Sequence, residues 1–454
     1  MNFLTAVLAA VLAAAAPQEE QTAGVEASSQ KDTSLIVLTL EDALKVALSE
    51  NISVKVADKE ILRTQYAKKG TYAALFPQVD GSIAYQRTIE KQKMYVDVEG
   101  FSPDGMEVGR WNTWSGGITA SMPVVNAQLW ESIRLSGEAV ELAVEKARAS
   151  RLSMVTSVKN AYYAVLLAKE VLGVYEKTYE NAQRSLDVTQ MKYNAQKASE
   201  MELVRAKTTV AAAIPNLYNA RNNVGLTLWQ LKAVMGVDLD YNMDVAGSLK
   251  DYAQQMFYDI HSNDDPDLSR NTTLLQLENQ IRQLDRTVKM NQMAYVPSIA
   301  LAFSYTYSAM ENTFNFNEYK WTPYSYVGLS ITIPIFSGCK RLNAVRQSKV
   351  QRDEALLQRT NTERQIRIAV KQDLGTMETG MKSYYAAESA VESARKAYEI
   401  TEESYKVGRS TLLDLNSALL ALAQNELTQW QAVYSFLSAK TDLEEQLGMD
   451  YNQQ

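Results

Sequence analysis

The sequence predicts a mainly α-helical protein with a small membrane β part, built from two similar halves in the order helix, strand, strand, long helix, helix. Three observations predict this fold class: an internal repeat, four segments in which apolar and polar residues alternate, and two helical stretches of about 67 residues each. Three chains together would form a twelve-stranded β-barrel that continues into a long α-helical barrel.

The first 16 residues are predicted to be a signal peptide, because Leu, Val and Ala fill most of residues 3–16 and the run ends in three alanines. A short membrane anchor is the alternative, but about 14 apolar residues cannot span a hydrocarbon core of about 30 Å as a helix. Residues 17–38 are predicted to form a polar leader. No later run reaches 18 apolar residues, so membrane contact must come from strands or from a surface.

The internal repeat appears when the chain is aligned with itself. Residues 51–77 align with residues 271–297 at an offset of 220, without a gap. Further on, an offset of 212 aligns these pairs: Tyr193 with Tyr405, Glu202 with Asp414 and Gly236 with Gly448. The chain therefore divides into a first repeat, an equatorial insert, a second repeat and a tail, at residues 39–236, 237–270, 271–448 and 449–454.

Four segments of alternating residues are the predicted strands, at about residues 78–95, 110–123, 298–309 and 321–334. In the third, Ile299, Leu301 and Phe303 alternate with small or polar neighbours. Segments of about ten residues with one apolar face suit the wall of a membrane barrel. An ordinary half-buried sheet would show the same alternation.

The number of strands predicts an oligomer. Four strands cannot close a barrel, because the smallest outer-membrane barrels have eight. An open edge in lipid would leave unpaired backbone groups, each costing several kcal/mol. Twelve strands from three chains are the smallest cyclic solution that leaves a usable lumen.

Aromatic residues gather near the ends of the predicted strands. Girdles of Trp and Tyr mark the two lipid–water interfaces of membrane barrels. The predicted interface residues are Trp111, Trp114, Tyr319, Trp321 and Tyr324.

Two stretches without a helix-breaking proline are predicted to be long helices, at about residues 126–193 and 338–405. At 1.5 Å per residue each is roughly 100 Å long. The opening helix, about residues 41–76, and the return helix, about residues 199–236, would each be roughly 55 Å long, so that together they match one long helix. This arithmetic predicts four-helix layers along a cylinder. Pro215, inside the return helix, should kink it or mark a break.

A heptad pattern favours coiled-coil packing of these helices. Of fifteen positions that step by three and four from residue 144 to residue 193, thirteen are apolar. A solid helical bundle would share this pattern.

Composition argues against most enzyme classes. The 454 residues include one histidine, His261, and one cysteine, Cys339, so neither a multi-histidine metal site nor a CxxC pair is present. No nucleotide-binding glycine loop and no GxSxG motif occurs, and we predict no cofactor and no metal. Composition does not exclude a hydrolase that uses a pair of Asp or Glu residues, but such an enzyme needs an active-site cleft, which long helices do not readily form. The net charge of −7 argues against a nucleic-acid partner.

The ordered set of segments resembles the TolC-type outer-membrane efflux ducts over about nine-tenths of the chain. Matching pieces are an opening LEDAL helix, a Pro at each helix–strand joint and a YKVGRSTLLD segment like the family's hairpin tip. The resemblance implies a homotrimer in the outer membrane, with a twelve-stranded barrel and a long periplasmic tunnel. It also implies a periplasmic adaptor (membrane fusion) protein and an inner-membrane RND or ABC-type pump as partners.

The resemblance also carries a few residues of the periplasmic aperture. Asp414 matches an acid that rings the aperture, whereas Ser417 stands where the family has a second acid. Glu202 and Tyr405 match an acid and a tyrosine that lock the tips, and Arg409 is the nearest base, one residue before the family position. The alternative for Glu202, Tyr405, Arg409 and Asp414 is a solvated, well-capped helical hairpin.

The function that follows is a passive outer-membrane duct, the exit of a tripartite efflux or type I secretion system, opened at its periplasmic tip when adaptor and pump dock. The alternative is a periplasmic coiled-coil scaffold that does not span the membrane. The chain is not expected to be an enzyme.

Overall fold

Helices of matching length account for most of the chain. The computed structural model describes residues 36–95, 105–254, 256 and 266–450. The three longest helices of the first half have 22, 68 and 36 residues, and the corresponding helices of the second half have 22, 67 and 36. The described helices are α2 (Leu40–Glu50), α3 (Ile52–Ala73), α4 (Ala127–Asn194), α5 (Glu200–Met235), α6 (Leu249–Ala253), α7 (Thr272–Met293), the 3₁₀ turn η2 (Phe316–Glu318), α8 (Lys340–Lys406) and α9 (Leu412–Leu447).

Four long strands form one antiparallel sheet in the order β2-β5-β7-β8. Strands β5 and β7 are central, so in the described chain β2 and β8 each leave one edge without a partner strand. The described strands are β1 (Ile36–Leu38), β2 (Gln78–Arg87), β3 (Gln92–Met94), β4 (Met106–Val108), β5 (Asn112–Val125), β6 (Met243–Val245), β7 (Ser298–Glu311) and β8 (Thr322–Thr332).

Equivalent caps begin and end helices in the two halves. The side chain of Asn51 accepts backbone N–H groups at the start of α3, and that of Asn271 does so at the start of α7. Gly236 ends α5 with φ 78°, and Gly448 ends α9 with φ 68°. A Cβ atom at Gly448 would lie 2.1 Å from the carbonyl oxygen of Arg270, so this turn needs glycine.

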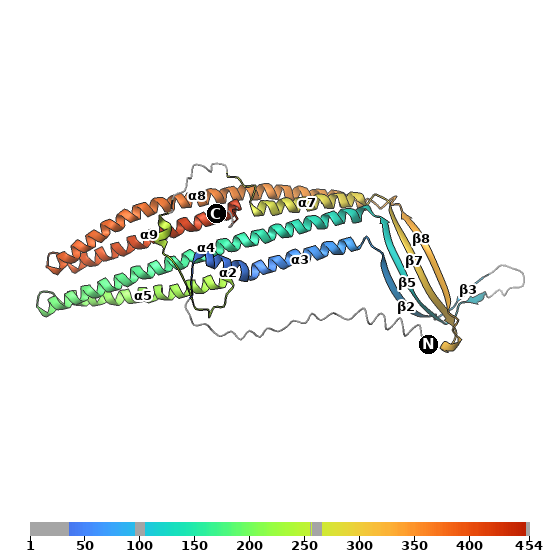
Figure 1. The fold of residues 1–454 in the computed structure, drawn as a ribbon, viewed down its shortest axis with the longest axis horizontal. Helices are drawn as coiled ribbons and strands as arrows, with labels where there is room; N and C mark the ends of the chain where they lie inside the picture. Colours follow the sequence, from blue (N-terminus) through green and yellow to red (C-terminus); the bar gives the residue numbers. More distant parts are fainter. Residues whose placement is uncertain (1–35, 96–104, 255, 257–265, 451–454) are drawn as a thin grey trace. The chain divides into compact units, whose positions relative to one another are not determined.

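The helices pack side by side around the two long ones. Helix α4 contacts α3, α5, α7 and α9, and helix α8 contacts α7 and α9. In Figure 1, α3 and α5 follow one another along α4, while α7 and α9 follow one another along α8. The predicted pairing of two short helices with each long helix is therefore present. None of the helices in the described ranges is both long and apolar enough to cross a membrane.

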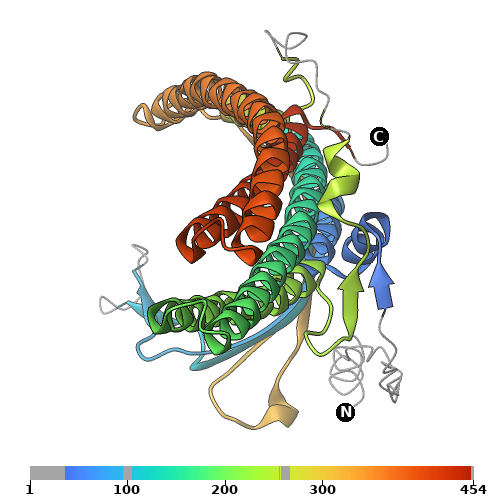
Figure 2. The same ribbon diagram turned by 90° about the vertical axis from the view of Figure 1, so that its left-hand side faces the viewer.

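The insert covers the middle of α4 on the convex side of the helix layer (Figure 2). The hydroxyl of Tyr162 donates to the carbonyl oxygen of Ala246 at 2.6 Å, and the carbonyl of Leu38 lies 3.2 Å away. Lys159 of α4 forms a nearly buried ion pair of 2.7 Å with Glu444 of α9. Apolar side chains from the insert, α4, α8 and α9 surround these groups, so the main core of the protein lies at this level.

Three expectations from the sequence differ from the structure. The predicted strand at 78–95 ends at Arg87, because the backbone bends at Ile89 and Glu90 and residues 92–94 pair with 106–108 as a separate small sheet. The last residues of the predicted polar leader form β1, where the carbonyl of Leu38 accepts the N–H of Ala246. The opening helix is split at Asn51, whose backbone is extended.

Two further points concern the ends and the return helix. Pro215 lies inside α5, which continues through it without a break. The predicted signal peptide, most of the leader, His261 and the end of the tail lie outside the described residues.

Candidate functional site

The four-stranded sheet has one apolar and one polar face. Residues opposite one another in the register share a face. Leu301 lies opposite Leu329 and Phe303 opposite Val327, and these side chains are exposed although they are apolar. On the other face Ala300 lies opposite Ser330. An exposed, continuous apolar face is what lipid contact requires.

The apolar face extends across all four strands. Its members beyond those already named are Val79, Ile83, Tyr85, Trp114, Ile118, Ala120, Met122, Ile299, Tyr305, Tyr307 and Ile331. In these strands its charged residues, Arg87 and Glu311, stand at the end farthest from the helices. Arg87 is exposed at the last position of β2, so this end of the sheet fits a level outside the hydrocarbon.

An aromatic cluster lies at the same end of the apolar face. The Trp114 ring lies 4.6 Å from that of Tyr85 and 5.6 Å from that of Phe316, measured between centroids. Tyr319 stacks on Phe316 at 5.3 Å and is buried, and its hydroxyl donates to the carbonyl of Thr313. Trp114 and Tyr319, two of the predicted interface residues, thus pack within the protein. Their partners Tyr85 and Phe316 were not predicted from the sequence.

The other three predicted interface residues differ among themselves. Trp111 lies under the ammonium group of Lys91, 4.5 Å from the ring centroid. Trp321 is exposed, just before β8. Tyr324 is exposed but lies opposite Thr306, on the polar face of the sheet and not on the face expected to contact lipid. Alternation along β8 places it with Tyr326 and away from the apolar side chains.

At the opposite end of the helices, Tyr405 joins the two hairpins. It is buried at the end of α8, and its hydroxyl lies 2.7 Å from that of Thr189 in α4. Lys192 of α4 donates to the backbone carbonyl of Tyr405, and its ammonium lies 3.8 Å from the centroid of the ring. Nearby, Asn416 of α9 donates to Thr209 of α5 at 3.0 Å.

Electrostatics tie Glu202 to this contact. Burial raises the pKa of Tyr405, the Thr189 hydrogen bond lowers it, and the negative charge of Glu202 raises it further. Burial lowers the pKa of Lys192, and Glu202 opposes that shift. The structure therefore brings Glu202, Tyr405 and Lys192 into one electrostatic group.

Arg409, the predicted base of the latch, does not join that group. Its side chain is exposed, and it makes no ion pair with any residue that the structure describes. The base beside Tyr405 is instead Lys192, which sequence reasoning missed. A signal was available, since the repeat offset of 212 aligns Lys192 with Ser404, so the lysine is a departure from the repeat.

The two acids of the tips also cap helices. The backbone N–H of Ser199 donates to Glu202 at 3.1 Å at the start of α5. The hydroxyl of Thr411 donates to Asp414 at 2.6 Å, and its N–H donates at 3.1 Å. These bonds hold the pKa of Asp414 below its usual range. Asp414 caps α9 through these bonds, and because its side chain is exposed it also remains accessible to solvent.

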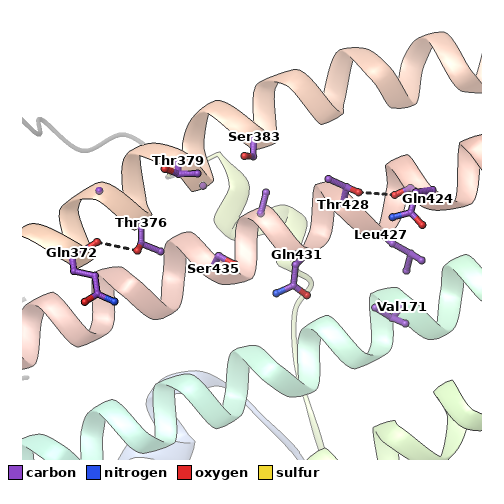
Figure 3. Close-up of a pocket in the computed structure, with 13 residues that line it drawn as sticks. Val171, Gln372, Thr376, Thr379, Ser383, Gln424, Leu427, Thr428, Gln431 and Ser435 are labelled. Atoms are coloured by element: carbon purple, nitrogen blue, oxygen red, sulfur yellow. Dashed lines mark hydrogen bonds between the residues drawn. The ribbon is translucent and has the colours of Figure 1, made fainter. Parts of the chain in front are cut away.

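A groove of about 800 Å³ runs between α8 and α9 (Figure 3). Uncharged residues line it, including Gln372, Thr376, Gln431 and Ser435. The Thr376 hydroxyl donates to the carbonyl of Gln372 in its own helix. The groove has no titratable side chain in its lining, so it offers no acid–base chemistry. In the described ranges no three His, Cys, Asp or Glu residues gather as a metal site.

Comparison with known proteins gives one consistent result. The model of a family described as outer membrane efflux protein matches residues 43–237 and 267–449. The chain is 21% identical over 348 residues to the outer membrane protein TolC of Escherichia coli, covering 74% of this chain and 70% of TolC. It is 22% identical over 434 residues to the probable efflux pump outer membrane protein TtgC of Pseudomonas putida, covering 91% and 84%.

Solved structures share the fold. The Campylobacter jejuni CmeC outer membrane channel superposes with a TM-score of 0.71 at 18% identity, covering 90% of this chain and 85% of CmeC. The outer membrane protein VceC of Vibrio cholerae gives a TM-score of 0.72 at 15% identity, covering 90% and 96%. The arrangement of sheet and helices described above is thus that of known outer membrane channels.

Proposed function

Because this chain belongs to the outer membrane efflux protein family, we propose that it forms a trimeric duct whose periplasmic end is held closed by the contact around Tyr405. The chain is an outer-membrane protein, and it serves as the exit duct of an efflux or secretion system. The family is one of channels, not of enzymes.

The proposal of a trimer rests on the sheet, which has an exposed apolar face and, among the described strands, two edges without partner strands. Lipid cannot satisfy the backbone groups of those edges. Strands β2 and β8 run antiparallel, because three antiparallel pairings separate them. An antiparallel pairing of β8 with β2 of the next chain therefore closes a twelve-stranded barrel with three copies.

The gate is proposed at the helical tips. The α4–α5 hairpin is joined to α8 where Thr189 and Lys192 of α4 contact Tyr405 of α8. Docking of an adaptor and pump would separate the hairpins and open the aperture beside Asp414. TtgC is named for an efflux pump, and a further relative, AprF of Pseudomonas aeruginosa, is named for alkaline protease secretion. Either an RND or an ABC-type pump is therefore a candidate partner.

Two measurements test this function against a periplasmic scaffold. Membranes that contain the protein are washed with alkaline carbonate, and the detergent-purified protein is added to planar bilayers. A duct stays in the membrane after the wash and gives stepwise conductance. A scaffold appears in the soluble fraction and gives no conductance, which would refute the proposal.

A further inference from the structure

The polar face of the sheet carries one charged side chain in the described strands. Its other members are mainly Ser, Thr, Ala, Gly, Gln and Tyr residues, and the exception is Asp80 of β2. Asp80 is exposed, and its carboxylate makes no hydrogen bond or ion pair with any described residue. It is therefore a free negative charge on a surface that is otherwise neutral.

Asp80 is the third residue of β2, and the register places it level with residues near the middle of the other three strands. Asp80 lies opposite Thr119 of β5, Thr119 lies opposite Ser304 of β7, and Ser304 lies opposite Tyr326 of β8. Arg87, at the polar end of the same strand, is seven positions beyond Asp80, about 23 Å along the strand at 3.3 Å per residue. A carboxylate at that depth needs water, so the polar face at Asp80 must line an aqueous space.

We infer that Asp80 selects cations over anions within the barrel part of the duct, as a filter separate from the helical tips. The inference rests on the proposed trimer, because closure makes the polar faces of three chains the wall of one lumen. Twelve strands about 4.8 Å apart and tilted by about 40° give a backbone radius of about 12 Å. Three carboxylates that project inward from this radius lie within about one screening length of the axis at 0.15 M salt.

The surroundings of Asp80 favour cations further. Tyr324 and Tyr326 lie on the same face, with ring centroids 5.9 Å apart, and closure places β8 beside β2 of the next chain. Tyrosine rings attract inorganic and organic cations. The carboxylate of Asp414 differs from that of Asp80, because it already accepts two hydrogen bonds from Thr411. The ligand class that this filter admits is small cations, including protonated amines.

The first test is the reversal potential of single ducts in a KCl gradient. We expect the ratio of K⁺ to Cl⁻ permeability to fall toward one in Asp80→Asn and to drop below one in Asp80→Lys. Because a closed tip could dominate selectivity, each variant is also measured with Lys192→Ala, which loosens the tip contact. The matched control Glu318→Gln removes an acid from the loop before β8 and should leave the ratio unchanged. Equal ratios in all Asp80 variants would overturn the inference.

A second test does not depend on the tips. Ser82 lies two residues from Asp80 on the same face, about 6.7 Å along the strand. Ser82→Cys, in a Cys339→Ser background, is labelled from the outer side with a cationic and an anionic thiosulfonate reagent. The ratio of the cationic to the anionic labelling rate should fall about three- to sevenfold when Asp80→Asn is added. This is the effect expected when one negative charge about 7 Å away in water is removed. A ratio that does not change would overturn the inference.

Failure of the proposed duct would look different. A single-chain mass, or the absence of stepwise conductance in the unaltered protein, would refute the trimer itself. A conducting trimer with unchanged selectivity and labelling ratios in Asp80→Asn would refute only the role of Asp80.

Discussion

The ammonium group of Lys192 lies 3.8 Å from the centroid of the Tyr405 ring and donates a hydrogen bond to the backbone carbonyl of the same residue. Lys192 lies in the last turn of the long helix of the first half, and Tyr405 lies in the last turn of that of the second. One side chain therefore connects the ends of the two long helices in each chain, at the place where we propose that the hairpins separate to open the duct.

The first prediction concerns this contact. Lys192→Ala should raise the conductance of the closed duct in planar bilayers, because it removes a cation–π interaction of about 0.5–2 kcal/mol and a hydrogen bond. Arg409→Ala is the matched control, since that exposed base has no partner among the described residues. If Arg409→Ala raises the conductance and Lys192→Ala does not, the base that holds the tips closed is Arg409, as the sequence suggested.

The second prediction separates two roles of Asp414. Thr411→Ala should lower the free energy of unfolding by about 0.5–2 kcal/mol, because it removes the cap of α9. It should leave ion selectivity unchanged. Asp414→Ala should lower stability as well and should also reduce cation selectivity of the closed duct. If both variants lose stability and neither loses selectivity, Asp414 is a cap only. Urea unfolding and reversal potentials give the two readouts.

The third prediction concerns the faces of the sheet. Leu329→Arg should cost about 2–4 kcal/mol of folding free energy in lipid vesicles, because its exposed side chain is on the apolar face. Ser330→Arg, the next residue on the polar face, should cost much less. Equal losses at both positions would mean that the apolar face does not contact lipid.

The fourth prediction concerns pH. Burial, with the negative charge of Asp442, raises the pKa of Asp373 to about 6. The unfolded chain has an ordinary Asp pKa of about 3.9, so the folded state binds this proton more tightly. The resulting loss of stability begins above about pH 4 and reaches its full size above about pH 6. Asp373→Asn should raise the melting temperature at pH 7.5, and the gain should shrink by pH 4.5. The exposed acid Asp187 supplies the control, Asp187→Asn. A gain independent of pH would exclude titration as its cause.

Much of the fold could be predicted from the sequence because its signals are local. The offsets of 220 and 212 place equivalent helices at equivalent positions, and alternation along residues 298–309 and 321–334 shows which residues share a face. The face of Tyr324 followed from that same alternation, since it shares parity with Ser330. Its aromatic character was given more weight than its position.

Other features depend on tertiary packing and could not be predicted. The cation beside Tyr405 is set by the rotation of α4 against α8, so proximity in sequence favoured Arg409 over Lys192. The burial of Tyr319 depends on the path of the loop between β7 and β8. The extended backbone of Asn51 splits the opening helix, although both sides of it are helical in pattern.

The most direct test of the account is the mass of the detergent-released protein by native mass spectrometry. The unpaired edges of β2 and β8 predict an assembly of three chains, and the Leu329→Arg variant should yield fewer such assemblies than Ser330→Arg. A stable single chain that remains inserted in lipid, with both edges of its sheet unpaired, would contradict the account.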